Sequence, residues 1–250
     1  MSLSGGPRRR LRSQPRELGI YLGAGCGRSA VDLLIYFQYV AFVGTFDVVV
    51  HRCIWTTLIL FITTTIFNKW ILFKKVFFNK KKVSILFITS VLIFGNWSIW
   101  IYAVATNKII DASFGYFIFP IISVFFGYLF FKEKLNKKRI ISISLIVVAT
   151  LYLLFNLDSL PWVGFAVAFL WSVYNLLRKK INVDTDIGLF IESLLIFPVA
   201  LVIFYLIFQN NLNDFSLSNP SLMALLFLAG PMTVIPLFLY IKGVQLSGLG

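Results

Sequence analysis

Long apolar runs separated by short charged segments make up most of the chain beyond its first residues. The clearest run extends from Ala112 to Phe131, carries no formal charge and ends at the segment Lys132–Leu135, which contains two lysines. A helix of about 20 apolar residues is about 30 Å long, which matches the hydrocarbon thickness of a bilayer. This run therefore predicts a helix that spans a membrane.

Small residues and a proline interrupt the large side chains of this run. Gly115, Ser123 and Gly127 lie in it, and the last two form a small-xxx-small pair that lets another backbone approach closely. Pro120 removes a backbone donor, so a neighbouring group must satisfy the freed carbonyl. We expect this helix to lie at the packed centre of a bundle rather than in lipid.

The same pattern predicts about eight spans along the chain. They cover Ile20–Tyr39, Asp47–Phe67, Val83–Ala105, Ala112–Phe131, Ile140–Asn156, Pro161–Leu177, Ile187–Phe208 and Leu222–Ile241. The first is the weakest, because Arg28 and Asp32 lie inside it, although as i, i+4 partners they can neutralise each other. The expected fold is an all-α integral membrane protein, a helical bundle without a separate soluble domain.

The loop charges predict the orientation of these spans. Residues 1–17 form a basic arm, and further basic clusters follow alternate spans, at 69–82, 132–139, 178–180 and 242. The opposite loops carry aspartates and a single lysine. Cytoplasmic loops are enriched in Lys and Arg, so this alternation places both termini in the cytoplasm. It also explains the net charge of +13 without a nucleic-acid partner.

Motifs of enzymes and metal sites are missing from the sequence. There is no GxSxG, Walker or HExxH motif, the chain has one histidine, and Cys26 and Cys53 form no CxxC pair. The 59% of hydrophobic residues exceeds what a soluble fold could bury, and no paired catalytic groups can be placed in the chain. We therefore expect a protein that is not an enzyme and that needs no cofactor or metal ion.

Polar and aromatic residues inside the predicted spans are the candidates for function. Asn96 and Trp100 share one helix face at i, i+4. Asn96 either lines a substrate path or makes a hydrogen bond between helices, and Trp100 either lines that path or belongs to an interfacial belt. Trp171 either forms an aromatic wall or faces the core or lipid.

Three ionisable residues lie inside predicted spans. Arg52 either extends to the outer headgroups or is a buried cation for a substrate or a pore side chain. His51 is either a packed imidazole or a proton relay. Glu192 either meets the basic cluster at 178–180 or is a proton or substrate group. Pro120, Pro198 and Pro236 predict kinks, which serve either packing or a cavity.

The chain as a whole resembles a known family. The matching segments are Val50–Trp55, Asn96–Val104, Ala112–Phe117 with Pro120, Lys132–Leu135, Leu177–Lys180, Gly188–Leu189 with Glu192, and Ala229–Thr233 with Pro236–Leu237. Together they resemble the EamA group of the drug/metabolite transporter superfamily. The resemblance implies a bundle of ten helices, built from two inverted five-helix repeats and embedded in the bacterial inner membrane.

Within this family fold, residues 18–157 correspond to the first repeat and residues 158–250 to three helices of the second, so the last two helices are expected beyond Gly250. The implied activity is transport of a small organic solute by alternating access, and the resemblance leaves the solute open. The aromatic residues and the cation of Arg52 suit an amino-acid-like or aromatic anionic solute. Arg52, Asn96, Trp100, Tyr116 and Trp171 would then line the substrate site, with His51 and Glu192 as candidates for proton coupling. The alternative is a membrane scaffold or transporter fragment that transports nothing and packs with a partner.

Overall fold

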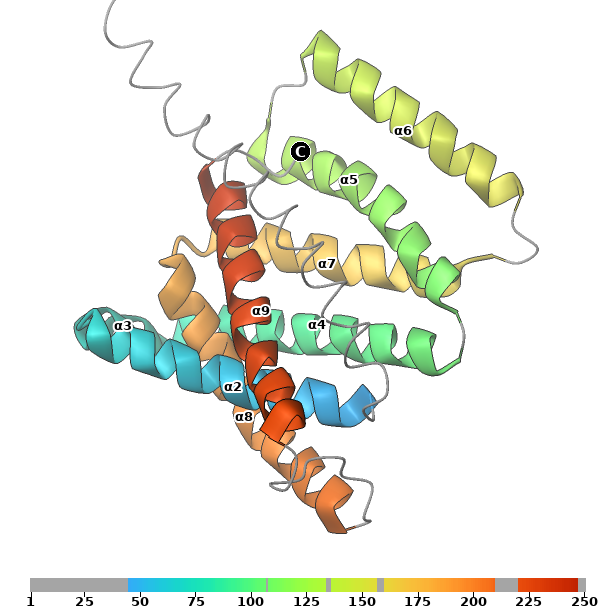
Figure 1. Ribbon diagram of the computed structural model, residues 1–250. Coiled ribbons are helices and arrows are strands. Elements are labelled where there is room, and N and C mark those ends of the chain that lie inside the picture. Colours follow the sequence, from blue (N-terminus) through green and yellow to red (C-terminus); the bar gives the residue numbers. More distant parts are fainter. Residues whose placement is uncertain (1–44, 107, 134–135, 157–159, 210–219, 247–250) are drawn as a thin grey trace, which may run out of the picture.

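The computed structural model describes residues 45–246 apart from 107, 134–135, 157–159 and 210–219 (Figure 1). The described helices are α2 (Thr45–Ile66), α3 (Trp70–Phe77), α4 (Lys80–Ala105), α5 (Ile109–Phe131), α6 (Lys137–Phe155), α7 (Trp162–Lys180), α8 (Thr185–Gln209) and α9 (Pro220–Leu246). The predicted basic arm 1–17 and the predicted span Ile20–Tyr39 lie outside the described residues.

Most of the described helices have the dimensions of membrane spans. Five of them, α2, α4, α5, α8 and α9, are long and apolar enough to cross a bilayer. The apolar part of α6, Arg139–Phe155, is shorter, and α7 is more polar and largely buried by its neighbours. The chain is therefore an all-α integral membrane protein, as its hydrophobic pattern predicts.

The basic segment after α2 differs from the prediction. We expected 69–82 to be a charged connection, but Trp70–Phe77 forms a helix and α4 already begins at Lys80. The reason is tertiary packing, because the rings of Trp70 and Phe73 lie 6.2 Å and 5.0 Å from the ring of Phe190 on α8. The charge pattern alone does not reveal this contact.

Several helix ends also lie beyond the predicted boundaries. Helix α7 continues to Lys180, and α9 continues to Leu246, so Lys242 belongs to a helix rather than to a loop. Helix α5 ends where expected: Lys132 adopts a left-handed φ of 51°, and the N–H of Glu133 donates to the carbonyl of Gly127 at 3.1 Å. The helices α5, α8 and α9 continue through their internal prolines.

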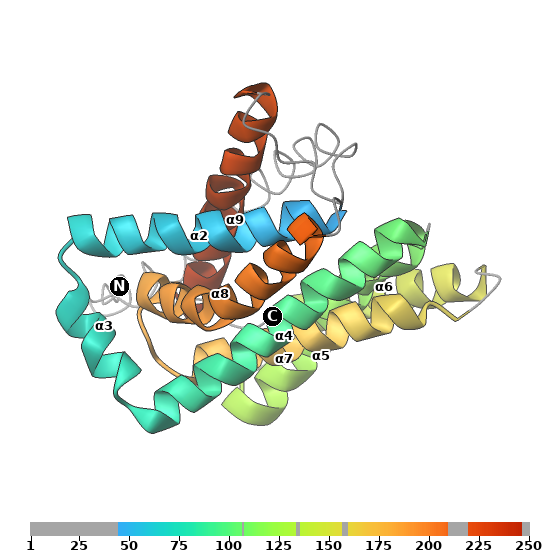
Figure 2. The same cartoon turned by 90° about the horizontal axis from the view of Figure 1, so that it is seen from below.

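The helices form two packed groups. Helix α2 contacts α8 and α9, whereas α7 contacts α4 and α5, and the contact between α4 and α8 joins the two groups. In both views α9 crosses α2 steeply (Figures 1 and 2), and Figure 1 shows α6 on the side of α5 away from α7. Helix α7 contacts both α4 and α5, whereas α4 keeps an exposed face that includes Phe87, Ile88 and Val91.

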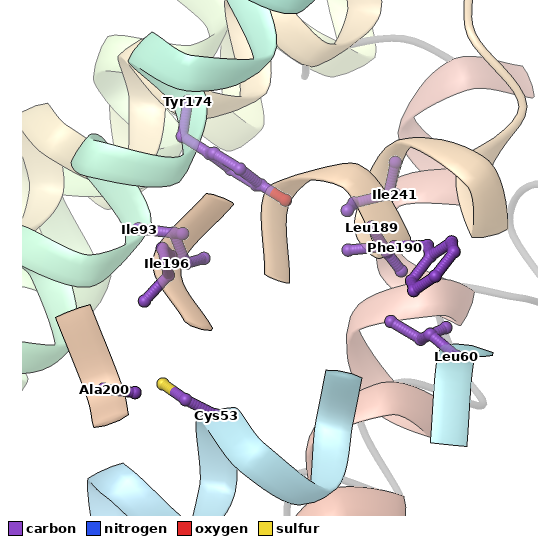
Figure 3. Close-up of a cluster of buried hydrophobic side chains, with 9 residues drawn as sticks. All are labelled: Cys53, Leu60, Ile93, Tyr174, Leu189, Phe190, Ile196, Ala200 and Ile241. Carbon is purple, nitrogen blue, oxygen red and sulfur yellow. The ribbon is translucent and has the colours of Figure 1, made fainter. Parts of the chain in front are cut away.

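The largest apolar cluster lies where the two groups meet. Its buried members come from five helices and are Cys53, Leu60, Ile93, Tyr174, Leu189, Phe190, Ile196, Ala200 and Ile241 (Figure 3). Helix α8 contributes more of them than any other element. The core of the bundle is thus centred on α8 and not on α5.

Helix α5 packs through its small residues, but it is not the centre of the bundle as predicted. Gly115 meets Gly164 of α7 so closely that a Cβ at Gly164 would lie 2.3 Å from the carbonyl oxygen of Asp111. Ser123 and Gly127 are also buried. The opposite side of α5 is exposed, and its residues there include Tyr116 at 58%. Helix α5 thus has one face packed against α7 and an opposite, exposed apolar face that is compatible with contact to lipid.

The close contact between α5 and α7 predicts that adding one methyl group at Gly164 destabilises the protein. Gly164→Ala is expected to lower the free energy of unfolding by about 1–3 kcal/mol, because the added Cβ overlaps the backbone of α5. The matched control is Gly95→Ala, whose Cβ would meet only a side-chain carbon of Leu170 at 3.8 Å. Thermal unfolding in detergent measures both, and equal melting temperatures for the two variants would contradict this packing.

Candidate functional site

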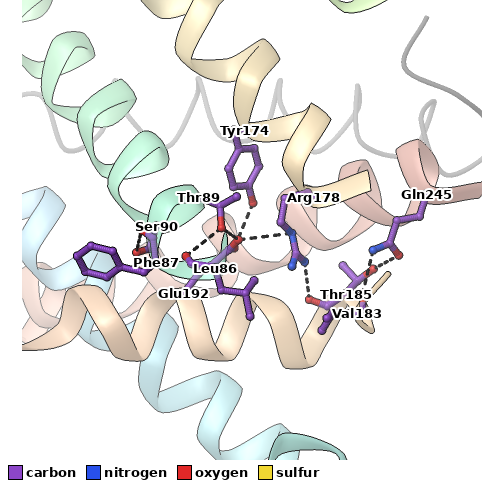
Figure 4. A network of polar contacts seen from close by, with 10 residues as sticks. All are labelled: Leu86, Phe87, Thr89, Ser90, Tyr174, Arg178, Val183, Thr185, Glu192 and Gln245. Atoms are coloured by element: carbon purple, nitrogen blue, oxygen red, sulfur yellow. Dashed lines mark hydrogen bonds and ion pairs between the residues drawn. The ribbon is translucent and has the colours of Figure 1, made fainter. Parts of the chain in front are cut away.

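A buried ion pair joins α7 to α8. Arg178 is fully buried near the end of α7, and its Nε lies 3.5 Å from Oε1 of Glu192, which is buried on α8 (Figure 4). Thr89 of α4 donates its hydroxyl to the same oxygen at 2.6 Å. Tyr174 of α7 donates to Oε2 of Glu192 at 3.3 Å. The carboxylate of Glu192 therefore links α8 to α4 and to α7.

A glycine on α8 makes room for the guanidinium. A Cβ at Gly188 would lie 2.0 Å from Nη1 of Arg178, so a side chain at this position would displace the arginine. Nη2 of Arg178 donates to the carbonyl of Thr185 at 3.2 Å. A charged group in an apolar interior is tolerated when it is paired and hydrogen-bonded. Gly188 and Thr185 thus hold the guanidinium beside Glu192.

The network continues into α9. The Thr185 hydroxyl donates to Oε1 of Gln245 at 2.8 Å, and Nε2 of Gln245 donates to the carbonyl of Val183 at 3.0 Å (Figure 4). Nearby, Nζ of Lys179 lies 2.6 Å from Oε1 of Glu133, just after α5. The turn between α7 and α8 is therefore tied to α4, α9 and the end of α5.

A small cavity lies beside the ion pair. Its volume is about 30 Å³. It is lined by Cys53, Thr56, Ile93, Trp97, Leu189, Glu192, Ser193, Ile196 and Leu237, which come from α2, α4, α8 and α9. A space of this size holds about two water molecules, whereas a small-molecule pocket usually has about 300 Å³ or more. The cavity is therefore closed to an organic solute by its size, and Glu192 is the only charged group in its lining.

Arg52 is bound within the bundle. Its Nε donates to the Thr233 hydroxyl on α9 at 2.6 Å, and its guanidinium carbon lies 4.2 Å from the ring centroid of Trp97 on α4. The hydroxyl of Thr233 in turn donates to the carbonyl of Ala229 at 2.7 Å. Trp97 also lines the cavity, so Arg52 contacts a residue of the cavity lining without belonging to the lining itself.

The other predicted binding residues lie outside this cavity lining. Asn96 is buried and bridges two helices, since its Nδ2 donates to the carbonyl of Val167 on α7 at 3.1 Å. The rings of Trp100 and Tyr116 lie 5.8 Å apart. Trp171 stacks on Tyr174 with ring centroids 5.3 Å apart, beside the ion pair. The structure thus brings Trp171 near Glu192 and leaves Trp100 and Tyr116 at the α4–α5 contact.

The predicted histidine and prolines lie at different places in the bundle. His51 is buried, with its ring 5.6 Å from that of Phe204. Pro120 lines a second hollow of about 290 Å³ between α5 and α6. Pro198 is exposed on α8, and Pro236 is next to the cavity residue Leu237. In the described part of the chain, no group of three His, Cys, Asp or Glu residues could hold a metal ion.

Sequence reasoning missed Arg178 as a site residue. It assigned Arg178 to a cytoplasmic charge cluster, together with Lys179 and Lys180. Two spacings carry the missing signal: Tyr174 and Arg178 are i, i+4 on α7, and Gly188 and Glu192 are i, i+4 on α8. The first spacing places a hydroxyl on the same helix face as Arg178, and the second places a residue without a side chain on the same face as Glu192. The expectation that Glu192 meets the basic cluster at 178–180 agrees with its pairing to Arg178.

These features define a class of protein: a polytopic helical membrane protein with a small, mostly apolar cavity among its spans, lined by one carboxylate. The model of the EamA-like transporter family matches residues 21–155, and the chain belongs to that family. It is 32% identical over 214 residues to the uncharacterized transporter YojE of Bacillus subtilis, covering 84% of this chain and 71% of YojE. It is 30% identical over 218 residues to the protein RarD of Escherichia coli, covering 86% of this chain and 74% of RarD.

An uncharacterized transporter of Vibrio cholerae is 32% identical over 219 residues, covering 86% of this chain and 72% of the relative. No solved structure gives a significant match to the chain. Two of these relatives are named as uncharacterized transporters, and family membership supports membrane transport of a small solute as the activity.

The ion pair predicts strong coupling between its two residues. Arg178→Met and Glu192→Met are each expected to lower the free energy of unfolding by about 3–5 kcal/mol, because each leaves one buried charge without its partner. The double variant is expected to lose much less than the sum, since no buried charge remains. Unfolding of the four proteins in detergent gives the coupling energy.

The matched control for this cycle is Lys180→Met, which removes an exposed cation two residues further along the chain. It is expected to change stability by no more than about 0.5 kcal/mol. If the two single effects simply add in the double variant, Arg178 and Glu192 do not act as a pair.

Proposed function

We propose that this protein moves a small organic solute across the bacterial inner membrane by alternating access and catalyses no chemical reaction. In this proposal α2–α6 belong to a first inverted repeat, residues 18–157, and α7–α9 belong to a second, residues 158–250. The observation that carries the proposal is the closed cavity, whose lining comes from α2 and α4 on one side and from α8 and α9 on the other. A substrate site between two repeats requires such a shared lining.

The proposed motion opens this cavity by moving the helices of the first repeat relative to those of the second. The cavity is too small for a solute as it stands, so α4 must move relative to α8. The hydrogen bond from Thr89 to Glu192 crosses that contact. The ion pairs at the α7–α8 turn close the same end of the bundle, since Lys69 pairs with Asp186 and Lys179 pairs with Glu133. In this view the structure represents a form closed at the α7–α8 turn.

The chemistry around the cavity supports an amino-acid-like or aromatic solute. Trp97 and Ile93 provide an apolar wall, and Glu192 provides a negative charge that attracts an ammonium group or a proton. The cation of Arg52 lies 4.2 Å from the Trp97 ring centroid, and in this proposal a rotation of that ring lets the guanidinium reach a substrate carboxylate. Arg52, Asn96, Trp100, Tyr116 and Trp171 remain the proposed binding residues, with His51 and Glu192 proposed for proton coupling.

Counterflow in proteoliposomes tests transport. The purified protein is reconstituted, and vesicles loaded with one unlabelled solute are given the labelled form, for a panel of amino acids and aromatic carboxylates. At least one solute is expected to enter faster than in empty vesicles. For that solute, Arg52→Ala is expected to raise the KM about 10-fold or more, because a charge-assisted hydrogen bond is lost.

Asn96→Ala is expected to slow transport as well, and Lys137→Ala, which removes an exposed cation at the start of α6, serves as the matched control. If no solute class enters faster than in empty vesicles, the transport proposal fails and the scaffold alternative replaces it. If a solute moves but Arg52→Ala and Asn96→Ala behave like the control, the proposed site is wrong.

Cysteine labelling tests the proposed orientation, with both termini in the cytoplasm. In a variant that lacks Cys26 and Cys53, single cysteines replace Lys75 on α3 or Thr106 after α4, both of which are exposed. An impermeant maleimide is expected to label Thr106→Cys in intact spheroplasts and Lys75→Cys only after the membrane is opened. The reverse labelling pattern would contradict the orientation.

A further inference from the structure

Helix α3 carries a surface that the transport proposal does not use. We define the α3 surface as the exposed apolar residues Ile71, Leu72 and Phe78 together with the exposed lysines Lys74, Lys75, Lys80 and Lys81. The whole segment 66–82 contains no acidic residue. It therefore combines apolar side chains with a positive charge that no neighbour in the segment neutralises.

The opposite face of α3 anchors the helix to the bundle. Val76 is buried, and the ring of Phe73 lies 5.0 Å from that of Phe190 on α8. The ring of Trp70 lies 5.4 Å from that of Phe61 on α2. These contacts hold the helix in one rotation about its axis. The α3 surface is consequently presented outward and not toward the core.

The exposed apolar residues of this surface are expected to lie in an apolar environment and not in water. Ile71 near the start of α3 is 80% exposed, and Phe78, the residue that follows its end, is 78% exposed. Eight residues of helix extend only about 12 Å, so α3 cannot itself cross the hydrocarbon. It joins the end of α2 to the start of α4, both of which are long enough to cross, and it turns away from the direction of α2 (Figures 1 and 2). This places α3 at the boundary between hydrocarbon and headgroups.

We propose that the α3 surface binds the headgroups of anionic phospholipids, with Ile71 and Phe78 in the acyl region and Lys74 and Lys75 at the phosphates. An amphipathic helix with lysines beside apolar residues lies in the interface in this way, and its affinity increases with the negative charge of the leaflet. Under the proposed orientation this is the cytoplasmic leaflet. The inference depends on the chain spanning a membrane and is independent of which solute it transports.

Native mass spectrometry of the full chain in detergent tests this proposal. The protein is titrated with dioleoylphosphatidylglycerol or dioleoylphosphatidylcholine, and bound lipids are counted. Phosphatidylglycerol is expected to bind more tightly than phosphatidylcholine. The variant Lys74→Gln/Lys75→Gln is expected to weaken phosphatidylglycerol binding about 10-fold or more, because two cations near the phosphates are lost. Ile71→Ser/Phe78→Ser is expected to weaken binding of the same lipid.

The matched control, Lys137→Gln/Lys180→Gln, removes two exposed lysines from α6 and α7. It is expected to bind phosphatidylglycerol like the unaltered protein, and all variants are expected to keep its melting temperature in detergent. Equal binding of the two lipids, an equal loss in the control, or unchanged binding by Lys74→Gln/Lys75→Gln would overturn the proposal. So would displacement of the lipid by inorganic phosphate at the same phosphate concentration, which would indicate a site for free anions.

Discussion

The buried pair of Arg178 and Glu192 constrains the rest of the bundle. A charge inside a membrane protein is costly unless protein surrounds it and supplies a partner, so neither residue can face lipid. This requirement places the pair inside the bundle, where the side chain of Arg178 on α7 reaches Glu192 on α8 and Thr89 of α4 lies beside it. The contacts from Thr89 and Thr185 follow from the same requirement, because the oxygens and nitrogens of the pair need hydrogen bonds.

Small residues determine how closely α7 can approach its neighbours. Gly164 allows the backbones of α5 and α7 to touch, and Gly188 leaves space for the guanidinium of Arg178. Without a hydrophobic force between helices in lipid, such close packing supplies much of the attraction that holds spans together. The glycines and the ion pair therefore act together. The space that Gly188 leaves allows the guanidinium of Arg178 to lie beside the carboxylate of Glu192.

Glu192 connects this structural network to the proposed function. The same carboxylate lines the closed cavity and accepts hydrogen bonds from α4 and α7. Any group that binds Glu192 from the cavity competes with Arg178 and Thr89 for its oxygens. A change in cavity occupancy would thereby alter the contacts that hold α4, α7 and α8 together, which is the physical link that alternating access needs.

The sequence by itself determined the class of the protein and most of its spans, because hydrocarbon thickness and the cost of charges in lipid act on each segment locally. It also pointed to Glu192, since an isolated carboxylate in an apolar run is recognisable without any neighbour. Only the tertiary structure decided that Arg178 is buried, that Trp70–Phe77 is a helix and that Asn96 bonds to Val167. The reason is physical: those outcomes depend on partners from other helices, and a residue's own neighbours in the chain do not specify which helix will pack against it.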